Sequence, residues 1–163
     1  MKLQSLRTDG CIDEVIQKHS NMVYRLAYAK TKSKSDADDI FQEVFFRYIR
    51  RNPVFESEEH EKAWFIRVTL NCSKKLWSSP WFRKTTSLED TLTFEVQEET
   101  GLHDALAELP QKYRIVIHLF YYGDLSIQQM SDIMGRKPST IRTQLTRARV
   151  MLKERLKGEL YDA

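Results

Sequence analysis

Side chains that could bind a nucleic acid gather near the C-terminal end of the sequence. From Gly135 to Lys157 eight residues are basic and only Glu154 is acidic. Such an excess of positive charge favours binding to a duplex phosphate backbone, because binding releases condensed counterions. Arginine and threonine side chains among them could also donate to base edges in a major groove. The pattern therefore indicates DNA binding, and the alternative is a basic helix face that is merely solvated.

The elements that would position these donors form a predicted helix-turn-helix. Ser126 and Gln129 make a capping box at the start of a first short helix. Gly135 stands where that helix would end in a left-handed residue, and Pro138 suits the first turn of the next helix. In this second helix one stripe is apolar, formed by Ile141, Leu145, Ala148, Leu152 and Leu156. On or near the opposite face lie the donors Ser139, Arg142, Thr143, Thr146 and Arg147.

A second candidate surface lies on a helix near residue 40. Ser35 is its expected N-cap, and its buried side is expected to carry Ile40, Phe41, Val44, Phe45, Tyr48 and Ile49. At 100° per residue the opposite side collects Asp39, Gln42, Glu43 and Phe46. A large aromatic residue ringed by polar groups is typical of a protein-docking surface. The alternative is that Phe46 packs under a neighbouring helix.

The third predicted helix begins near residues 57–61 and continues to Trp77. It places Trp64 on one side and the polar residues Arg67, Asn71, Lys74 and Lys75 on another. Interleaved aromatic and basic side chains suit single-stranded nucleic acid, because bases stack on the rings and phosphates pair with the charges. An ordinary core helix with a basic outer face is the alternative. Phe55 stands in the loop before this helix without a periodic partner.

Composition and charge indicate an all-α fold of two small helical domains. The 163 residues include only five Gly and four Pro, and helix-period patterns recur. The net charge is +3 over residues 1–79, −4 over residues 80–105 and +4 over residues 106–163, which sum to the +3 of the whole chain. We therefore expect domains at 1–79 and 105–163, joined by an acidic flexible linker at 80–104.

The sequence offers no set of residues that would make an enzyme. Cys11 and Cys72 have neither metal-ligand nor disulfide-framework spacing, and reduced thiols are expected. His19 and His118 lie in apolar helical patterns and are expected in the core or on a helix surface. We find no phosphate-binding glycine loop and no zinc motif, and we expect no metal, no cofactor and no catalysis. Without a signal peptide or a membrane-spanning apolar run, the expected location is the cytoplasm.

Three motifs together resemble the extracytoplasmic-function subfamily of bacterial RNA polymerase sigma factors. They are residues 36–45 (DADDIFQEVF), residues 63–71 (AWFIRVTLN), and Leu109-Pro110 followed by the helix-turn-helix. The resemblance runs from about residue 11 to residue 157. It implies a region 2 domain and a region 4 domain joined by a flexible linker. The implied function is to bind core RNA polymerase and direct promoter recognition and transcription initiation.

The resemblance also implies roles for individual residues. Asp39, Gln42 and Glu43 match positions that bind the clamp helices of the largest polymerase subunit, and Phe46 extends that face. The expected −10 DNA contacts are Phe55, Trp64, Arg67, Asn71, Lys74 and Lys75. Among them, Phe55 lies in the loop where the family captures a flipped base. The expected −35 DNA contacts are Lys137, Ser139, Thr140, Arg142, Thr143, Thr146, Arg147 and Arg149. Region 4 is expected to dock on the flap of the second-largest subunit, and an anti-sigma factor is an expected partner.

Two other functions remain open from the residues alone. A stand-alone helix-turn-helix regulator would bind promoter duplex tightly without polymerase. A protein-binding helical adaptor would show no salt-dependent affinity for DNA, because its basic face would be only solvated.

Overall fold

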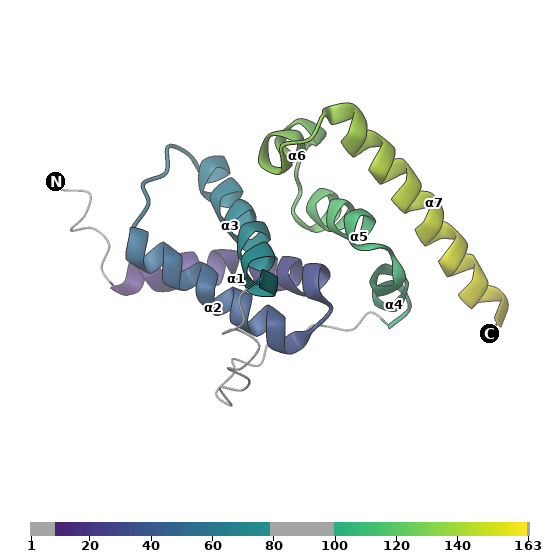
Figure 1. Cartoon of the computed structure of the whole chain (residues 1–163), viewed down its shortest axis with the longest axis horizontal. Coiled ribbons are helices and arrows are strands. Elements are labelled where there is room, and N and C mark those ends of the chain that lie inside the picture. Colours follow the sequence, from purple (N-terminus) through teal and green to yellow (C-terminus); the bar gives the residue numbers. More distant parts are fainter. Residues whose placement is uncertain (1–8, 79–99, 163) are drawn as a thin grey trace. The chain divides into compact units, whose positions relative to one another are not determined.

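The computed structural model describes residues 9–78 and 100–162 of the chain (Figure 1). Throughout these two ranges the regular structure is helical, which confirms the predicted all-α fold. The chain divides into two compact units between residues 86 and 87. We call them the N-terminal unit, which contains α1 to α3, and the C-terminal unit, which contains α4 to α7.

Three long helices pack against one another in the N-terminal unit: α1 (Asp9–Thr31), α2 (Lys34–Arg51) and α3 (Glu58–Ser78). Phe65 of α3 is fully buried at the centre of their core. Its ring lies 5.5 Å from Phe45, 5.4 Å from Tyr48 and 5.0 Å from Trp64, measured between centroids. Aromatic pairs at such distances add to the stability gained by burying their area. The core therefore fixes α3, with its candidate nucleic-acid face, to the other two helices.

The start and the outer edge of α2 differ from the prediction. Ser33, not Ser35, is the N-cap, and its side chain accepts a hydrogen bond from the backbone N–H of Asp36 at 3.2 Å. Lys32 turns the chain with a left-handed φ of 53°, so the extended cap residue comes directly after it. Ile49, predicted to be buried, is 48% exposed, because it lies at the border of the apolar stripe.

The C-terminal unit is built along its longest helix, α7 (Pro138–Asp162) (Figure 1). The helices α4 (Thr100–Glu108), α5 (Gln111–Ile117) and α6 (Ile127–Met134) all pack on α7. The predicted apolar stripe is confirmed at Ile141, Leu145 and Ala148, which are almost completely buried. Because α4 begins at Thr100, residues 100–104 of the predicted linker are helical, and residues 80–99 lie outside the described part of the chain.

The helix predicted from Gln111 to Tyr122 has the expected length, but its last turn, η1 (His118–Tyr122), is π-helical. A Cβ atom on Gly123 would lie 2.6 Å from the backbone oxygen of Leu119, so this close approach requires glycine. The wider turn leaves Tyr121 and Tyr122 exposed and Leu119 buried. Single π turns within helices are frequent at functional sites.

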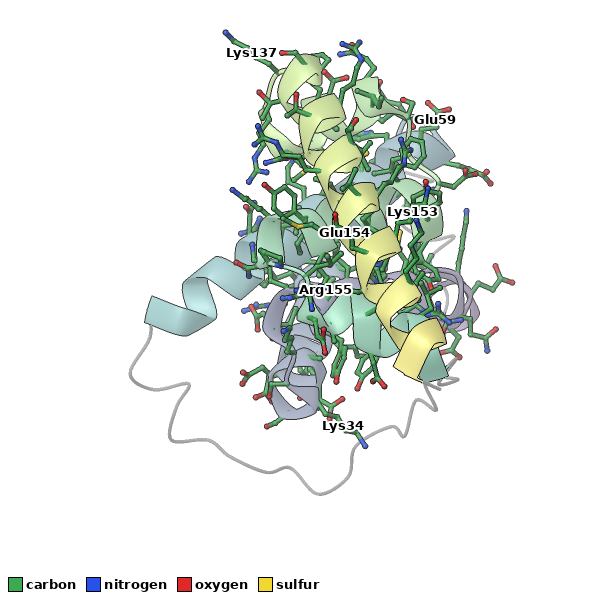
Figure 2. The ribbon with its side chains drawn as sticks, turned by 90° about the vertical axis from the view of Figure 1, so that its right-hand side faces the viewer. Lys34, Glu59, Lys137, Lys153, Glu154 and Arg155 are labelled. Atoms are coloured by element: carbon green, nitrogen blue, oxygen red, sulfur yellow. The ribbon has the colours of Figure 1, made fainter. Side chains whose placement is uncertain are left out.

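Polar contacts hold the short helix α4 in place. The guanidinium of the buried Arg114 donates to the backbone oxygen of Leu109 at 2.8 Å. Arg155 on α7 pairs with Glu108 at the end of α4. Figure 2 shows Lys153 and Arg155 projecting to opposite sides of α7, so only Arg155 faces the side where α4 lies. The C-terminal unit therefore keeps one side of α7 for packing.

Candidate nucleic-acid and protein interfaces

The outward face of α2 carries the predicted docking residues. Phe46 is 57% exposed, so the alternative that it packs under a neighbouring helix is wrong. Asp39, Gln42 and Glu43 are partly exposed on the same helix. Glu43 accepts hydrogen bonds from Arg47 at 2.9 Å and from Arg50 at 3.3 Å, which partly neutralise its charge. An incoming partner would compete with these ion pairs, which are weak at an exposed site.

Asp39 differs electrostatically from an ordinary surface carboxylate. Its partial burial raises its pKa, and the negative charges of Asp36 and Asp38 raise it further. A cationic group from a partner would relieve this repulsion, so the site favours positively charged or hydrogen-bonding partners. The α2 face combines one exposed aromatic ring with an acidic patch that benefits from neutralisation.

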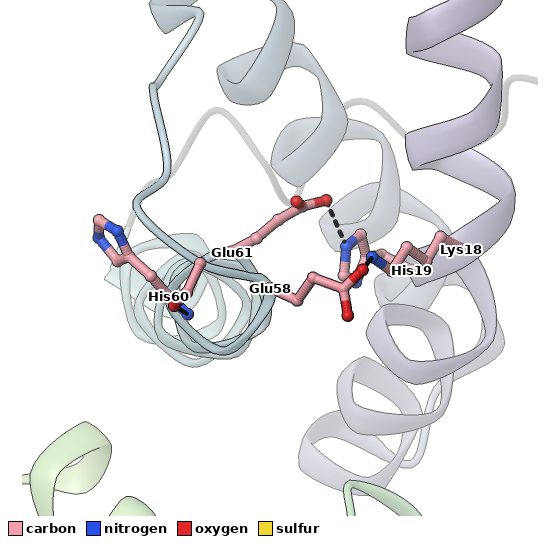
Figure 3. Close-up of polar contacts among 6 residues, drawn as sticks. Lys18, His19, Glu58, His60 and Glu61 are labelled. Carbon is pink, nitrogen blue, oxygen red and sulfur yellow. Dashed lines mark hydrogen bonds and ion pairs between the residues drawn. The ribbon is translucent and has the colours of Figure 1, made fainter.

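The first turn of α3 is anchored to α1 by two pairs of side chains (Figure 3). His19 Nε2 and Glu61 Oε1 are 2.8 Å apart, and Lys18 Nζ donates to Glu58 at 3.4 Å. His19 is buried and stacks on Phe65, with 4.4 Å between ring centroids, which confirms its predicted core or helix-surface position. Ser57 caps the helix by accepting from the backbone N–H of His60 at 3.1 Å.

We expect His19 to make the stability of this unit depend on pH. Burial lowers the pKa of His19 below its ordinary value of about 6.5, and the hydrogen bond to Glu61 offsets only part of that effect. The unfolded chain therefore binds a proton more readily than the folded one. Stability should fall as the pH drops below about 6.5 and approach a constant loss below the folded-state pKa.

The measurement is the midpoint of thermal unfolding between pH 5 and pH 7.5 for wild type and His19→Gln. Glutamine keeps a donor for Glu61 but does not titrate, so its profile should be flatter, with a lower midpoint at neutral pH from the lost stacking. Gln17→Ala, at an exposed position on the same helix, is the matched control and should keep the wild-type slope, because it neither adds nor removes a titratable group. Parallel profiles for wild type and His19→Gln would contradict the assignment.

The loop between α2 and α3 is held by aromatic contacts that the sequence did not reveal. Phe55, expected to stand alone, lies with its ring 5.4 Å from His60 and 5.9 Å from Trp64. The Trp64 ring also contacts Tyr48 at 6.1 Å and is only partly exposed. Trp64 therefore supports the loop, and Phe55, which is partly exposed and lies within the loop itself, is the candidate ring for stacking a base.

Farther along α3, the side chains that the structure describes form the predicted polar face. Arg67 and Asn71 are exposed, while Val68 and Cys72 are buried on the other side. Lys74 and Lys75 belong to α3, but their side chains lie outside the described residues. The accessible face thus begins at the aromatic loop and continues through Arg67 to Asn71.

The helix-turn-helix of the C-terminal unit has the predicted local structure. Ser126 and Gln129 form both hydrogen bonds of a capping box, at 3.1 Å and 2.9 Å. Gly135 ends α6 in the left-handed conformation, with φ of 66°, and Pro138 opens α7. These features fix the orientation of α7 relative to α6. A helix-turn-helix needs this fixed orientation to place its second helix in a DNA groove.

All the predicted −35 residues are exposed: Lys137, Ser139, Thr140, Arg142, Thr143, Thr146, Arg147 and Arg149. Two of the arginines have aromatic partners on α5 and η1 that the sequence did not indicate. Arg149 donates to the Tyr121 hydroxyl at 2.9 Å and lies over the Phe120 ring at 5.3 Å. A hydrogen bond from Arg147 lowers the pKa of Tyr113. Part of the basic face is therefore preorganised by aromatic residues of α5 and η1.

Within the two described ranges, no three His, Cys, Asp or Glu side chains come together as metal ligands would. Nor does any of the helices seen there combine the length and apolar character needed to cross a bilayer.

Comparison with known proteins identifies both units. The family model "Sigma-70 region 2" matches residues 15–82, and "Sigma-70, region 4" matches residues 100–152. The chain is 30% identical to the ECF RNA polymerase sigma factor SigM of Bacillus subtilis, over 87% of this chain and 93% of SigM. It is 28% identical to the RNA polymerase sigma factor SigV of the same organism, over 93% of this chain and 95% of SigV.

Solved structures share the fold. CnrH, in complex with the cytosolic domain of CnrY, has a TM-score of 0.68 at 18% identity and covers 96% of this chain and 94% of its own. RpoE from Bartonella quintana, in complex with the anti-sigma factor NepR, has a TM-score of 0.62 at 20% identity and covers 86% and 95%. With its two sigma regions and its SigM relative, the chain belongs to the extracytoplasmic-function family of bacterial RNA polymerase sigma factors.

Proposed function

We propose that the protein binds core RNA polymerase through the α2 face and directs it to promoters with its two units. The observation that carries the proposal is the exposed Phe46 beside Asp39, Gln42 and Glu43, on a unit that also presents a loop and helix suited to single strands. The largest subunit's clamp helices are the proposed partner of this face. Residues 1–79 would act as region 2 and the chain from α4 onward, beginning at Thr100, as region 4, with the segment between them as the linker.

In the open promoter, the loop and the outer face of α3 would hold the melted −10 strand. Melting costs about 1.4 kcal/mol for each base-pair step. Stacking one extruded base on an aromatic ring can return about 1–3 kcal/mol, so capture beside Phe55 would offset the cost of roughly one to two steps. Trp64 would support Phe55, while Arg67, Asn71, Lys74 and Lys75 would bind the sugar-phosphate chain or neighbouring bases.

The exposed face of α7 would read the −35 duplex in its major groove. Arginine can pair with two acceptors of guanine, and threonine can contact either a base edge or a thymine methyl. Arg142, Thr143, Thr146 and Arg147 are the proposed reading residues. Lys137, Ser139, Thr140 and Arg149 would contact phosphates and set the orientation.

Other partners follow from the relatives. Because RpoE is bound to the anti-sigma factor NepR in its solved structure, an anti-sigma factor is a proposed partner of this chain. The C-terminal unit would dock on the flap of the second-largest polymerase subunit.

The protein would act in the cytoplasm as a non-catalytic initiation factor, with polymerase performing the chemistry.

The test is transcription in vitro by purified bacterial core polymerase on a library of randomised promoters, with and without the protein. We expect transcripts only when the protein is added, and the enriched promoters should share −10 and −35 elements. A stand-alone regulator would instead bind a duplex tightly without polymerase and would yield no such transcripts. An adaptor would give neither transcripts nor salt-dependent DNA binding.

A further inference from the structure

Side chains on the first turn of α3 point to two different sides of the helix (Figure 3). Glu58 and Glu61 point toward α1, where they meet Lys18 and His19. The ring of His60 lies on the side away from α1, next to the loop that precedes the helix. His60 is therefore an exposed side chain on a turn that is anchored from behind.

A hydrogen bond with the loop positions the His60 ring and selects the tautomer of its neutral form. Its Nδ1 accepts the backbone N–H of Glu56 at 3.2 Å. A neutral imidazole that accepts through one nitrogen carries its proton on the other, so Nε2 is the donor. Because His60 is exposed, this N–H is available to a ligand at the surface of the loop.

An aromatic ring stands directly beside this donor. The rings of Phe55 and His60 are 5.4 Å apart and nearly perpendicular, at 88°. Trp64 supports Phe55 from the helix, and Val54 adds an apolar side chain that is 71% exposed. An apolar surface with one adjacent donor suits a flat ligand that stacks by its face and accepts a hydrogen bond at its edge, as an unstacked base does.

Nearby charges favour a base edge over a phosphate. Glu56, whose backbone N–H donates to the His60 ring, and Glu59, the residue directly before His60, both carry exposed carboxylates. A phosphate placed against His60 would be repelled by both, whereas a neutral base would not. The donor is therefore better matched to the uncharged carbonyl oxygen or ring nitrogen of a base.

We propose that His60 is a specificity-determining residue for the −10 element. Its Nε2–H donates to an acceptor on the edge of the base captured beside Phe55, and so selects bases that place an acceptor there. This inference rests on the proposed role of the loop in −10 recognition. His60 would then hydrogen-bond the edge of the captured base, in addition to Phe55, which stacks on its face.

Two substitutions separate reading from loop positioning. In His60→Asn the side-chain oxygen can replace Nδ1 as the acceptor for Glu56, but no donor reaches the Nε2 position. In His60→Gln the amide N–H can reach the Nε2 position, but the acceptor near Glu56 is lost. Glu58→Ala, on the same turn but with its side chain directed toward α1, is the matched control. Each variant is combined with core polymerase and measured on single-stranded −10 DNA from an enriched promoter, and abasic replacements at each position locate the captured base.

We expect His60→Asn to weaken binding about fivefold, the factor that corresponds to one hydrogen bond, while His60→Gln stays within about twofold of wild type. The loss in His60→Asn should vanish on DNA that is abasic at the captured position. A loss that persists on abasic DNA, or a loss in His60→Gln alone, would overturn base reading by His60. If Phe55→Ala and the abasic scan both had no effect while core binding stayed intact, the loop's proposed −10 role would fail, and this inference with it.

Discussion

Replacing Gln42 and Phe46 together with alanine is expected to weaken binding to core RNA polymerase by at least about 30-fold. Exposed aromatic residues at the centre of an interface often contribute 2 kcal/mol or more, which corresponds to this factor. Phe46 is 57% exposed, so more than half of its surface is available to a partner in the free protein. The measurement is the equilibrium affinity of each variant for purified core polymerase.

The control must show that the double variant still folds. Because Phe46 is a surface residue, its loss should change the free energy of unfolding by only about 0.5 kcal/mol. Glu59→Ala, an exposed substitution at the start of α3 (Figure 2), should keep wild-type affinity. Equal binding by wild type and the double variant would move the polymerase interface to another face and leave the function in place.

Ile49 provides a second check on the extent of this interface. It is 48% exposed and lies one turn after Phe46 on the same helix. Periodicity alone assigned it to the core, because an apolar residue at the border of a stripe fits either side. The exposed apolar surface of α2 is therefore larger than the sequence indicated, and Ile49→Ala would measure whether the polymerase contact extends that far.

Periodicity and capping predicted most of the fold because they are local properties. The capping box at Ser126, the left-handed Gly135 and the stripe through Ile141 and Leu145 depend only on neighbours within a few turns. By sequence alone, Ser33 and Ser35 both suit the N-cap of α2, because each is a serine followed by acidic residues. The choice of Ser33 depends on the left-handed turn at Lys32, for which the sequence gives no strong signal.

The contacts that complete the candidate sites join residues far apart in the sequence. The bonds His19 to Glu61 and Arg149 to Tyr121 span 42 and 28 residues, so no periodic pattern contains both partners. The π-helical turn that carries Tyr121 has a clear local mark only in Gly123. The Phe55–His60 contact is closer in sequence, but it crosses a loop-to-helix boundary where neither period applies. The types of side chain in the sequence thus predicted where the candidate binding surfaces lie. The contacts within those surfaces depend on the tertiary structure.

The other large effect is expected at α7, where Arg142→Ala combined with Arg147→Ala should weaken holoenzyme binding to the −35 element about 100-fold. Loss of an arginine that reads a base costs about 1–3 kcal/mol, and loss of one that binds a phosphate lowers the salt slope by about one. Arg147 also contacts Tyr113, so its removal disturbs a preorganised group as well as a contact to DNA. The measurements are affinity at several salt concentrations and a scan of −35 base substitutions.

Lys153→Ala is the matched control for this double variant, because Lys153 is a basic residue exposed farther along the same helix (Figure 2). Its loss should reduce affinity modestly and equally for all sequences, as expected of a distant charge. The double variant should instead lose its preference at particular −35 positions while −10 opening, once the complex forms, remains. The double variant could instead keep its −35 preferences and lose only affinity, with a smaller dependence of that affinity on salt concentration. In that case α7 would bind the duplex by charge, and the residues that read the sequence would lie elsewhere in the C-terminal unit.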